Sequence, residues 1–305
     1  MTRKTKSISA LRTEQTNRAA RDLDQKSALE IATLINKEDA TVATAVRRAL
    51  PQIARAIDQV AGAIRGGGRL IYIGAGTSGR LAALDASEVP PTFNVPHSTV
   101  QFLIAGGEKA LASETEASED DTALARREMA KRKPGKRDVV LGIASSGRTP
   151  FTVAALTEAR RRGAKTIALT CNRNSPLERA AHFAIVTEVG PEVLAGSSRM
   201  KAGTAHKMVL NMISTAAMTR LGYVYGNLMV NVVPKNEKLS QRAVGILEKA
   251  TGASHEAASA ALRASGNNTP VATVMLAAKT NRPQAARALK NSRGNVRQAI
   301  EAAQR

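Results

Sequence analysis

The spacing of hydrophobic positions changes several times along the chain. Two early stretches, Leu23–Asn36 and Val42–Ile64, have apolar residues at helical spacing and predict helices. Short apolar runs bounded by glycine or polar residues follow, which is typical of buried strands. These expected strands are Arg69–Ile73, Thr99–Ile104, Asp138–Ile143, Thr166–Leu169 and Phe183–Thr187. Because helical patterns separate most of them, we expect an α/β fold with a mostly parallel sheet sandwiched by helices.

After Arg199 the pattern becomes wholly helical. Met200–Leu221 predicts one long helix that is apolar over most of its surface, which favours a homodimer interface. Beyond Pro234 we expect short helices at Lys238–Lys249, His255–Ala264, Thr269–Ala278, Pro283–Lys290 and Asn295–Ala303. Thr269 is the expected N-cap of the third, with Pro270 at its first position. The pattern predicts an N-terminal helical segment over 1–50, an α/β domain over 51–234 and a small all-helical domain over 235–305.

Composition narrows the class of protein. The 305 residues are 43% hydrophobic, enough for an ordinary core, although Trp is absent. The one cysteine, Cys171, cannot form an intrachain disulfide, and no Cys-His spacing suggests a zinc site. The N-terminus has no apolar signal-peptide stretch, and Asn211 and Arg220 interrupt the most apolar segment. We therefore expect a cytoplasmic protein without a membrane partner.

The formal net charge of +20 invites a nucleic-acid interpretation. The excess is spread along the chain, however: residues 126–137 carry seven Lys and Arg against one Glu, and residues 235–305 carry twelve against four. Aromatic residues for base stacking are not interleaved with these charges. We expect no specific nucleic-acid partner and a basic surface suited to anionic metabolites.

Two polar loops each follow an expected strand. Gly74–Arg80 (GAGTSGR) provides glycines for a tight turn and the hydroxyls of Thr77 and Ser78 for an anion. It is not a dinucleotide fingerprint, because Thr77 and Ser78 occupy its middle. It is not a Walker loop either, because no Lys followed by Ser or Thr ends it. Ser145–Pro150 (SSGRTP) repeats the arrangement after a second strand. Two such loops in one sheet predict two walls of one polar site.

Acidic residues follow both loops in sequence. Glu88 precedes Pro90-Pro91, which we expect to end a helix, and residues 114–121 hold five carboxylates around a helix N-terminus. Most of these carboxylates are explained by a favourable interaction with the helix dipole and by exposure to solvent. Two carboxylates of unequal pKa could also divide the roles of general acid and base. Farther on, Ser197 and Ser198 look like caps of the long helix, Glu188–Lys207 is a plausible lid, and His206 is interpreted as a surface or interface histidine.

Together these segments resemble the N-acetylmuramic acid 6-phosphate etherase family. The resemblance rests on IYIGAGTSGRLAALDASEVPPTF, EASEDD, GIASSGRTPF and GPEVLAGSSRMKAGTAHKMVLNMISTAAM, with TEQTN near the start and GNNTPVATVMLAAK near the end. These motifs are long, occur in order and cover nearly the whole chain. At His206 relatives are expected to carry an amide side chain.

The resemblance implies a sugar-isomerase domain, a C-terminal bundle resembling a ubiquitin-associated domain, and a homodimer that needs no cofactor. It implies cleavage of the D-lactyl ether of N-acetylmuramic acid 6-phosphate, with Glu88 and Glu119 as the catalytic pair. The expected substrate-binding residues are Gly76, Thr77, Ser78, Gly79, Ser145, Ser146, Arg148, Thr149, Glu192, Ser198 and Lys201. Two alternatives stay open, a non-catalytic phosphosugar-binding regulator and an aldose–ketose sugar phosphate isomerase.

Overall fold

The computed structural model describes residues 11–113 and 116–305, so the predicted carboxylate Glu114 lies outside the described residues. Contacts within the chain define two compact units. The first extends through Ala86 and continues over Ser98–Ser214, and the second comprises Ser87–His97 and Thr215–Arg305. The boundary drawn from the sequence between residues 234 and 235 stays a prediction.

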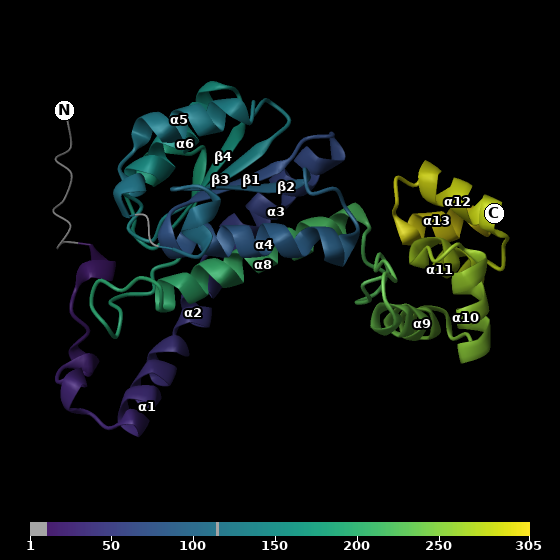
Figure 1. Ribbon diagram of the computed structural model, residues 1–305, viewed down its shortest axis with the longest axis horizontal. Coiled ribbons are helices and arrows are strands. Elements are labelled where there is room, and N and C mark those ends of the chain that lie inside the picture. The colour runs from purple at the N-terminus through teal and green to yellow at the C-terminus, as the bar shows by residue number, and fades with distance from the viewer. Residues whose placement is uncertain (1–10, 114–115) are drawn as a thin grey trace. The chain divides into compact units, whose positions relative to one another are not determined.

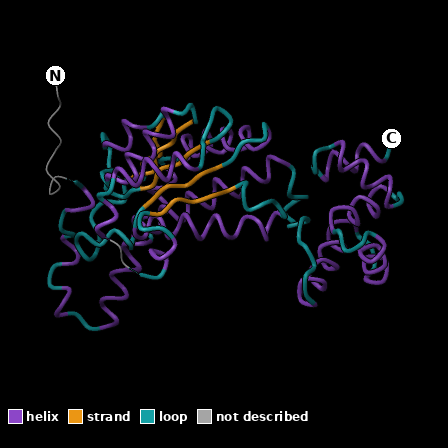
Figure 2. The backbone as a smooth tube through the Cα atoms, turned by 45° about the horizontal axis from the view of Figure 1, so that its top comes forward, coloured by secondary structure: helices purple, strands orange, loops and turns teal. Residues whose placement is uncertain are grey.

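A five-stranded sheet forms the centre of the first unit (Figures 1 and 2). Its strands are β1 (Leu70–Gly74), β2 (Val100–Ile104), β3 (Val139–Ile143), β4 (Lys165–Thr170) and β5 (Phe183–Val186). All four pairings are parallel, in the order β2-β1-β3-β4-β5. Each strand lies within one residue of its predicted bounds, and the predicted α/β fold is confirmed.

Helices cover both faces of this sheet. Figure 1 shows α5 (Thr122–Lys131) and α6 (Pro150–Arg161) on one face, with α3 (Leu50–Arg65), α4 (Gly76–Phe93) and α8 (Lys201–Leu221) on the other. The strand β1 is buried on both sides, as its continuous apolar run requires. The short α7 (Pro176–Ala180) precedes β5. Small residues such as Ala155 and Ala168 fill much of the core beside Phe151.

The N-terminal helices are shorter than the periodicity predicted. Leu23–Gln25 is a single 3-10 turn, and α1 (Ala28–Asp39) begins only after Ser27, whose hydroxyl accepts from the backbone N–H of Glu30. The predicted helix Val42–Ile64 is divided into α2 (Val42–Arg47) and α3. Pro51 explains the division, because a proline lacks an N–H and fits only the first turn of a helix.

The end of α4 corrects a second expectation. The helix does not stop before Pro90-Pro91 but continues through both residues to Phe93. The hydroxyl of Thr92 donates to the carbonyl oxygen of Glu88 at 2.6 Å, and the N–H of Asn94 donates to that of Pro90 at 2.9 Å. The helix ends where Asn94 adopts a φ of 52°.

Five short helices make up most of the second unit. They are α9 (Glu237–Thr251), α10 (His255–Ala264), α11 (Thr269–Ala278), α12 (Arg282–Asn291) and α13 (Val296–Ala303). Their core is built from Ala, Val, Leu and Ile side chains, among them Leu247 and Ala272. Thr269 is not the N-cap of α11, because Asn268 accepts from Val271 N–H at 3.1 Å. Thr269 is buried and donates its hydroxyl to Val232 O at 2.8 Å.

Candidate functional site

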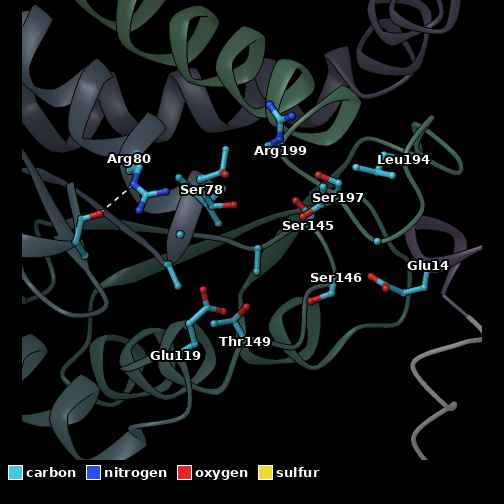
Figure 3. Close-up of a pocket in the computed structure, with 18 of the residues that line it drawn as sticks. Glu14, Ser78, Arg80, Glu119, Ser145, Ser146, Thr149, Leu194, Ser197 and Arg199 are labelled. Atoms are coloured by element: carbon cyan, nitrogen blue, oxygen red, sulfur yellow. Dashed lines mark hydrogen bonds between the residues drawn. The ribbon is translucent and has the colours of Figure 1, made fainter. Parts of the chain in front are cut away.

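A cavity of about 810 Å³ opens beyond the carboxyl ends of β1 and β3. The chain leaves β1 toward β2 and later returns to β3 on the other side, and ligands of open parallel sheets bind at such a reversal. Figure 3 shows residues that line it. The lining comprises Glu14, Ala75, Gly76, Thr77, Ser78, Arg80, Ala110, Glu119, Ile143, Ala144, Ser145, Ser146, Thr149, Leu194, Ala195, Gly196, Ser197, Ser198 and Arg199.

The wall after β1 is the first turn of α4, which contributes Gly76, Thr77 and Ser78 to the lining. The turn lies close against the sheet because Gly79 has no side chain: a Cβ there would lie 2.5 Å from Cγ1 of Ile104. The amides of a helix's first turn have no partner within the helix and favour an anion. Beside the two hydroxyls, they make this wall suitable for a phosphate.

The wall after β3 is the loop that leads into α6, which contributes Ser145, Ser146 and Thr149. The side chain of Thr149, the N-cap of α6, accepts no hydrogen bond from the first turn of that helix. The loop is supported from behind, since Asn172 Nδ2 donates to Ser145 O at 2.9 Å and Thr170 Oγ1 donates to the same oxygen at 3.2 Å. The two predicted walls thus meet in one pocket.

Of the two predicted catalytic glutamates, only Glu119 lines the cavity. Its Oε1 lies 3.2 Å from where a Cβ on Gly76 would be, and Gly76 has a φ of 51°, so a side chain at that position is disfavoured twice. Figure 3 shows the Glu119 carboxylate close to Thr149. Glu88 is exposed on α4 and is not part of the lining. Asp121 accepts from Leu124 N–H and caps α5, as the dipole interpretation predicts.

Two arginines line the cavity and differ in their bonding. The guanidinium of Arg80 donates to Ala110 O and Ser113 O, both at 2.9 Å, and so fixes the neighbouring 3-10 turn Glu108–Leu111. Within residues 11–113 and 116–305, Arg199 makes no hydrogen bond or ion pair. Arg199 is therefore available to an anionic group of a ligand.

Glu192 and Lys201, both predicted to bind substrate, are outside the lining and support α8 instead. The fully buried Glu192 carboxylate accepts from Lys201 N–H at 2.9 Å and from Ala202 N–H at 3.0 Å. Burial raises the pKa of Glu192. Lys201 Nζ pairs with Glu38 Oε2 at 2.5 Å. The cap of α8 is thus Glu192 rather than the predicted serines, and substrate contact by Glu192 or Lys201 stays a prediction.

Gly79 and Arg148 are likewise absent from the lining, and Arg148 lies in the loop before α6. Its N–H donates to Ser146 Oγ at 3.2 Å. Ser198, the remaining member of the predicted set, does line the cavity. The structure therefore brings most, though not all, of the predicted binding residues together.

A chain of buried polar groups runs behind Ser78. The Ser78 hydroxyl lies 3.4 Å from Nδ1 of His206, whose Nε2 lies 3.7 Å from Sγ of Cys171. Burial lowers the pKa of His206 to about 4 and raises the pKa of the Cys171 thiol to about 12, so both are neutral near pH 7. The interpretation of His206 as a surface or interface histidine was wrong, because its side chain is fully buried within the single chain, behind Ser78.

A second cavity, of about 450 Å³, lies at the amino ends of β1 and β3. Lys133, Lys136 and Arg137 line it. Asp138, in the same lining, pairs with Arg69 at 2.9 Å. Part of the basic charge is thus placed at the edge of the sheet opposite to the hydroxyl-lined pocket.

The described parts of the chain contain no cluster of three or more His, Cys, Asp or Glu side chains that could hold a metal ion. Among the same residues, none of the helices has the length and hydropathy needed to cross a membrane.

A parallel sheet with hydroxyl-rich loops at its reversal point is the arrangement of the SIS domain class. Residues 120–216 match the SIS domain family, and residues 52–160 match the N-terminal SIS domain of the glucokinase regulatory protein. The structure of a phosphoheptose isomerase from Francisella tularensis aligns with a TM-score of 0.51 at 18% identity, covering 64% of this chain and 100% of that chain. That likeness concerns the fold alone.

Closer relatives identify the family. N-acetylmuramic acid 6-phosphate etherase 1 of Bacillus licheniformis is 50% identical over 254 residues, which cover 83% of this chain and 84% of that protein. The N-acetylmuramic acid 6-phosphate etherase of Symbiobacterium thermophilum is 54% identical over 255 residues, with coverages of 83% and 84%. The chain belongs to the N-acetylmuramic acid 6-phosphate etherase family, as its motifs predicted.

Proposed function

We propose that this protein cleaves the D-lactyl ether of N-acetylmuramic acid 6-phosphate with water, giving N-acetylglucosamine 6-phosphate and D-lactate. Membership of the etherase family supports this carbon–oxygen lyase activity. The observation that carries the proposal is the place of Glu119, whose carboxylate lines a pocket that is rich in hydroxyl groups and helix N-termini. The role is that of recycling and catabolism of cell-wall amino sugars, in the cytoplasm, since charged sugar phosphates do not cross an apolar bilayer unaided.

The phosphate binds between the two loop walls in this proposal. Thr77, Ser78, Ser145, Ser146 and Thr149 all line the cavity and carry hydroxyl groups that can donate to its oxygens. The N-termini of α4 and α6 add backbone amides and the positive ends of two helix dipoles. Arg199 remains for a second anionic group, and the lactyl carboxylate of the substrate is one.

The alkoxide of lactate is too poor a leaving group for direct displacement by water at C3. The proposed reaction is therefore an elimination followed by a hydration. Opening of the sugar ring exposes an aldehyde at C1, which acidifies the proton on C2. A base removes that proton, the C3–O bond breaks, and an acid protonates the departing lactate oxygen. Water then adds to C3 of the unsaturated aldehyde, and the C2 proton is restored.

Two carboxylates of unequal protonation perform these transfers. Glu119 is the proposed base, because it lies in the pocket beside the hydroxyl groups. Glu88 is the proposed acid, although its exposed position on α4 lies outside the pocket lining of this chain. A homodimer in which a second copy completes the site would reconcile these two positions.

Exposed leucines support a homodimer. The chain itself buries Val209, Leu210 and Ile213, so much of the apolar surface of α8 does not require a partner. The helix α1, by contrast, has no buried residue, and its Leu29 is 77% exposed. Leu194 at the pocket is 53% exposed. A closed two-fold interface is the commonest way to cover such residues.

The test incubates pure protein with N-acetylmuramic acid 6-phosphate and measures D-lactate. Stoichiometric D-lactate and N-acetylglucosamine 6-phosphate are expected, and activity should survive chelation of metal ions. A folded protein that binds the substrate without turnover would instead be a phosphosugar-binding regulator. Conversion of a sugar phosphate to its ketose without lactate would indicate an isomerase.

Complementation tests the shared site. Glu88→Gln and Glu119→Gln should each be inactive. If the two glutamates act from different chains, unfolding and refolding an equal mixture should restore about a quarter of the wild-type activity, since half of the dimers are mixed and each has one intact site. No recovery in mixed dimers would mean that both glutamates act from one chain. Sedimentation at micromolar concentration measures the oligomer, and an active monomer would refute the dimer.

A further inference from the structure

The segment around Glu14 is tied to the α/β unit by the buried side chain of Asn172. Asn172 is 5% exposed, and its Oδ1 accepts from Arg12 N–H at 3.0 Å. Its Nδ2 donates to Thr13 Oγ1 at 3.0 Å and to Ser145 O at 2.9 Å. Thr13 is 1% exposed. Both neighbours that precede Glu14 are therefore fixed to the same side chain that supports the pocket loop after β3.

This attachment places Glu14 in the wall of the cavity. Glu14 belongs to the 3-10 turn Arg12–Glu14 and lines the pocket from a segment more than fifty residues before β1. Figure 3 shows its carboxylate extending into the pocket on the side of Ser146. Its Oε2 lies 3.8 Å from where a Cβ on Gly196 would be, so the carboxylate lies beside the loop that bears Arg199. Within the described residues, no hydrogen bond or ion pair engages this carboxylate.

The chemistry of a carboxylate limits what it can bind here. An ionised carboxylate only accepts hydrogen bonds, and it repels phosphate and other carboxylates. The anion-binding features of the pocket lie elsewhere, at the first turns of α4 and α6 and at Arg199. A ligand whose phosphate occupies those features therefore presents its neutral O–H and N–H groups to Glu14.

We propose that Glu14 is a specificity-determining residue of this pocket, whose carboxylate accepts hydrogen bonds from the hydroxyl or amide N–H groups of the bound sugar, and that Asn172 is the residue that positions it. The proposal deepens the proposed function, because it rests on the pocket binding a phosphosugar. Hydrogen bonds to Glu14 distinguish sugar phosphates from inorganic phosphate, because inorganic phosphate bound at the two loops has no neutral donor group that reaches Glu14.

Hydrogen bonds to a charged acceptor are stronger than neutral ones, and a positioned side chain loses little entropy on binding. Removing the carboxylate in Glu14→Ala should therefore weaken the binding of N-acetylglucosamine 6-phosphate about tenfold to a hundredfold. Binding of inorganic phosphate should stay within about twofold or become tighter, because a repelling charge is removed. Glu14→Gln keeps one neutral acceptor and should lie between Glu14→Ala and the wild type.

The experiment measures the dissociation constants of N-acetylglucosamine 6-phosphate and of inorganic phosphate by calorimetry, and KM and kcat for D-lactate release. Asp24→Asn is the matched control, since Asp24 is an exposed carboxylate on the same N-terminal segment outside the pocket lining. It should leave both affinities and KM unchanged. Equal loss of sugar phosphate and phosphate affinity in Glu14→Ala would overturn the proposed specificity, and so would wild-type affinity for the sugar phosphate.

The role of Asn172 is tested through its coupling to Glu14. Asn172 also supports the Ser145 loop, and damage to that loop would weaken phosphate and sugar phosphate binding alike, so the measured quantity is the ratio of the two affinities. If Asn172 acts by holding Glu14, Asn172→Ala should lower this ratio in the wild type and should lower it little further in a protein that already carries Glu14→Ala. Fully additive losses would refute the positioning role. Thermal unfolding is measured in parallel, and if Asn172→Ala fails to fold, Asn172→Asp, which keeps the acceptor for Arg12 N–H, replaces it in the same cycle.

The outcomes separate this inference from the proposed reaction. A wild-type protein that releases no D-lactate, yet binds the sugar phosphate in a manner dependent on Glu14, would refute the reaction and support the inference. A wild-type protein that releases D-lactate with a KM unaffected by Glu14→Ala would do the reverse. If the wild-type protein binds neither substrate nor product, both are refuted.

Discussion

The two units of the molecule differ in how their helices begin. In the second unit, α9 to α13 each start at an Asn or Ser whose side chain accepts from a backbone N–H of the first turn. In the first unit, α1, α5 and α7 are capped in the same way, but α6 starts at the pocket with no such cap, and α8 receives its cap from Glu192, which lies nine residues before Lys201. A missing cap does not by itself indicate a binding site, because the N-cap side chains of α2 and α3 also make no cap hydrogen bond. At α6, however, the uncapped backbone N–H groups lie next to the hydroxyl groups of the pocket, where a ligand can accept hydrogen bonds from both.

This difference teaches that binding capacity resides where the fold leaves polar groups unsatisfied. The second unit satisfies its helix ends locally, and its residues should affect stability without affecting turnover. The pocket of the first unit gathers hydroxyl groups, helix N-termini and carboxylates in its lining, and its residues should affect turnover first. Variants in the two units, compared by the same two measurements, can sharpen this contrast or break it.

The largest effect is expected from the glutamates. Glu119→Gln and Glu88→Gln keep the shape of the side chain but remove its proton transfer, which is worth about 10²–10⁴-fold in kcat. Binding of the sugar phosphate by calorimetry should change by only a few-fold. A near-wild-type kcat for either variant would return that glutamate to a structural or solvated role.

Glu192→Ala should destabilise the protein by about 3 kcal/mol, because it leaves the buried N–H groups of Lys201 and Ala202 without an acceptor. Denaturant unfolding measures the loss. The matched control is Glu188→Gln, which breaks a partly exposed ion pair with Arg173 and should cost less than about 1 kcal/mol. Equal effects of the two variants would contradict the capping role of Glu192.

His206 should make stability depend on pH. Its folded-state pKa of about 4 lies below its ordinary value of 6.5, so the unfolded chain binds the proton more readily as the pH falls. The contribution is fully present above pH 6.5 and is lost toward pH 4, by about 2 kcal/mol between pH 7 and pH 5. Relative to His206→Gln, which has no such proton, the wild type should lose this amount over that interval in denaturant unfolding. Parallel pH profiles of the two proteins would contradict a buried neutral imidazole.

The smallest effect is expected in the second unit. Asn281→Ala removes the capping box that Asn281 forms with Gln284 at the start of α12, and it should cost about 1 kcal/mol. Asn281→Ser, which restores a capping oxygen, should recover most of that stability. Neither variant should change kcat for D-lactate release. A change in kcat at unaltered stability would break the proposed contrast between the units.

The sequence by itself determined the strands, the C-terminal helices and the two walls of the pocket, but not the bounds of the N-terminal helices or the end of α4. All five strands were predicted within one residue, because a short buried apolar run between turn residues is a local signal. The loops after β1 and β3 could be placed together because the carboxyl ends of parallel strands meet at one edge of a sheet. All five C-terminal helices α9 to α13 were predicted within two residues for the same local reason, through their periodicity and turn residues.

Tertiary structure decided which polar groups face the pocket and which serve the core. The resemblance grouped Glu192 and Lys201 with the substrate, and the structure adds contacts that the sequence could not show: Glu192 caps α8, and Lys201 pairs with Glu38. The sequence left Glu14 unassigned, although the TEQTN motif that contains it was a signal, since its place depends on Asn172, about 160 residues farther along the chain. The burial of His206 could not be predicted from the sequence for the same reason. The burial of a side chain and its hydrogen-bond partners depend on segments that are distant in the sequence. Contacts between such segments produce no periodic pattern along the chain, so sequence analysis does not detect them.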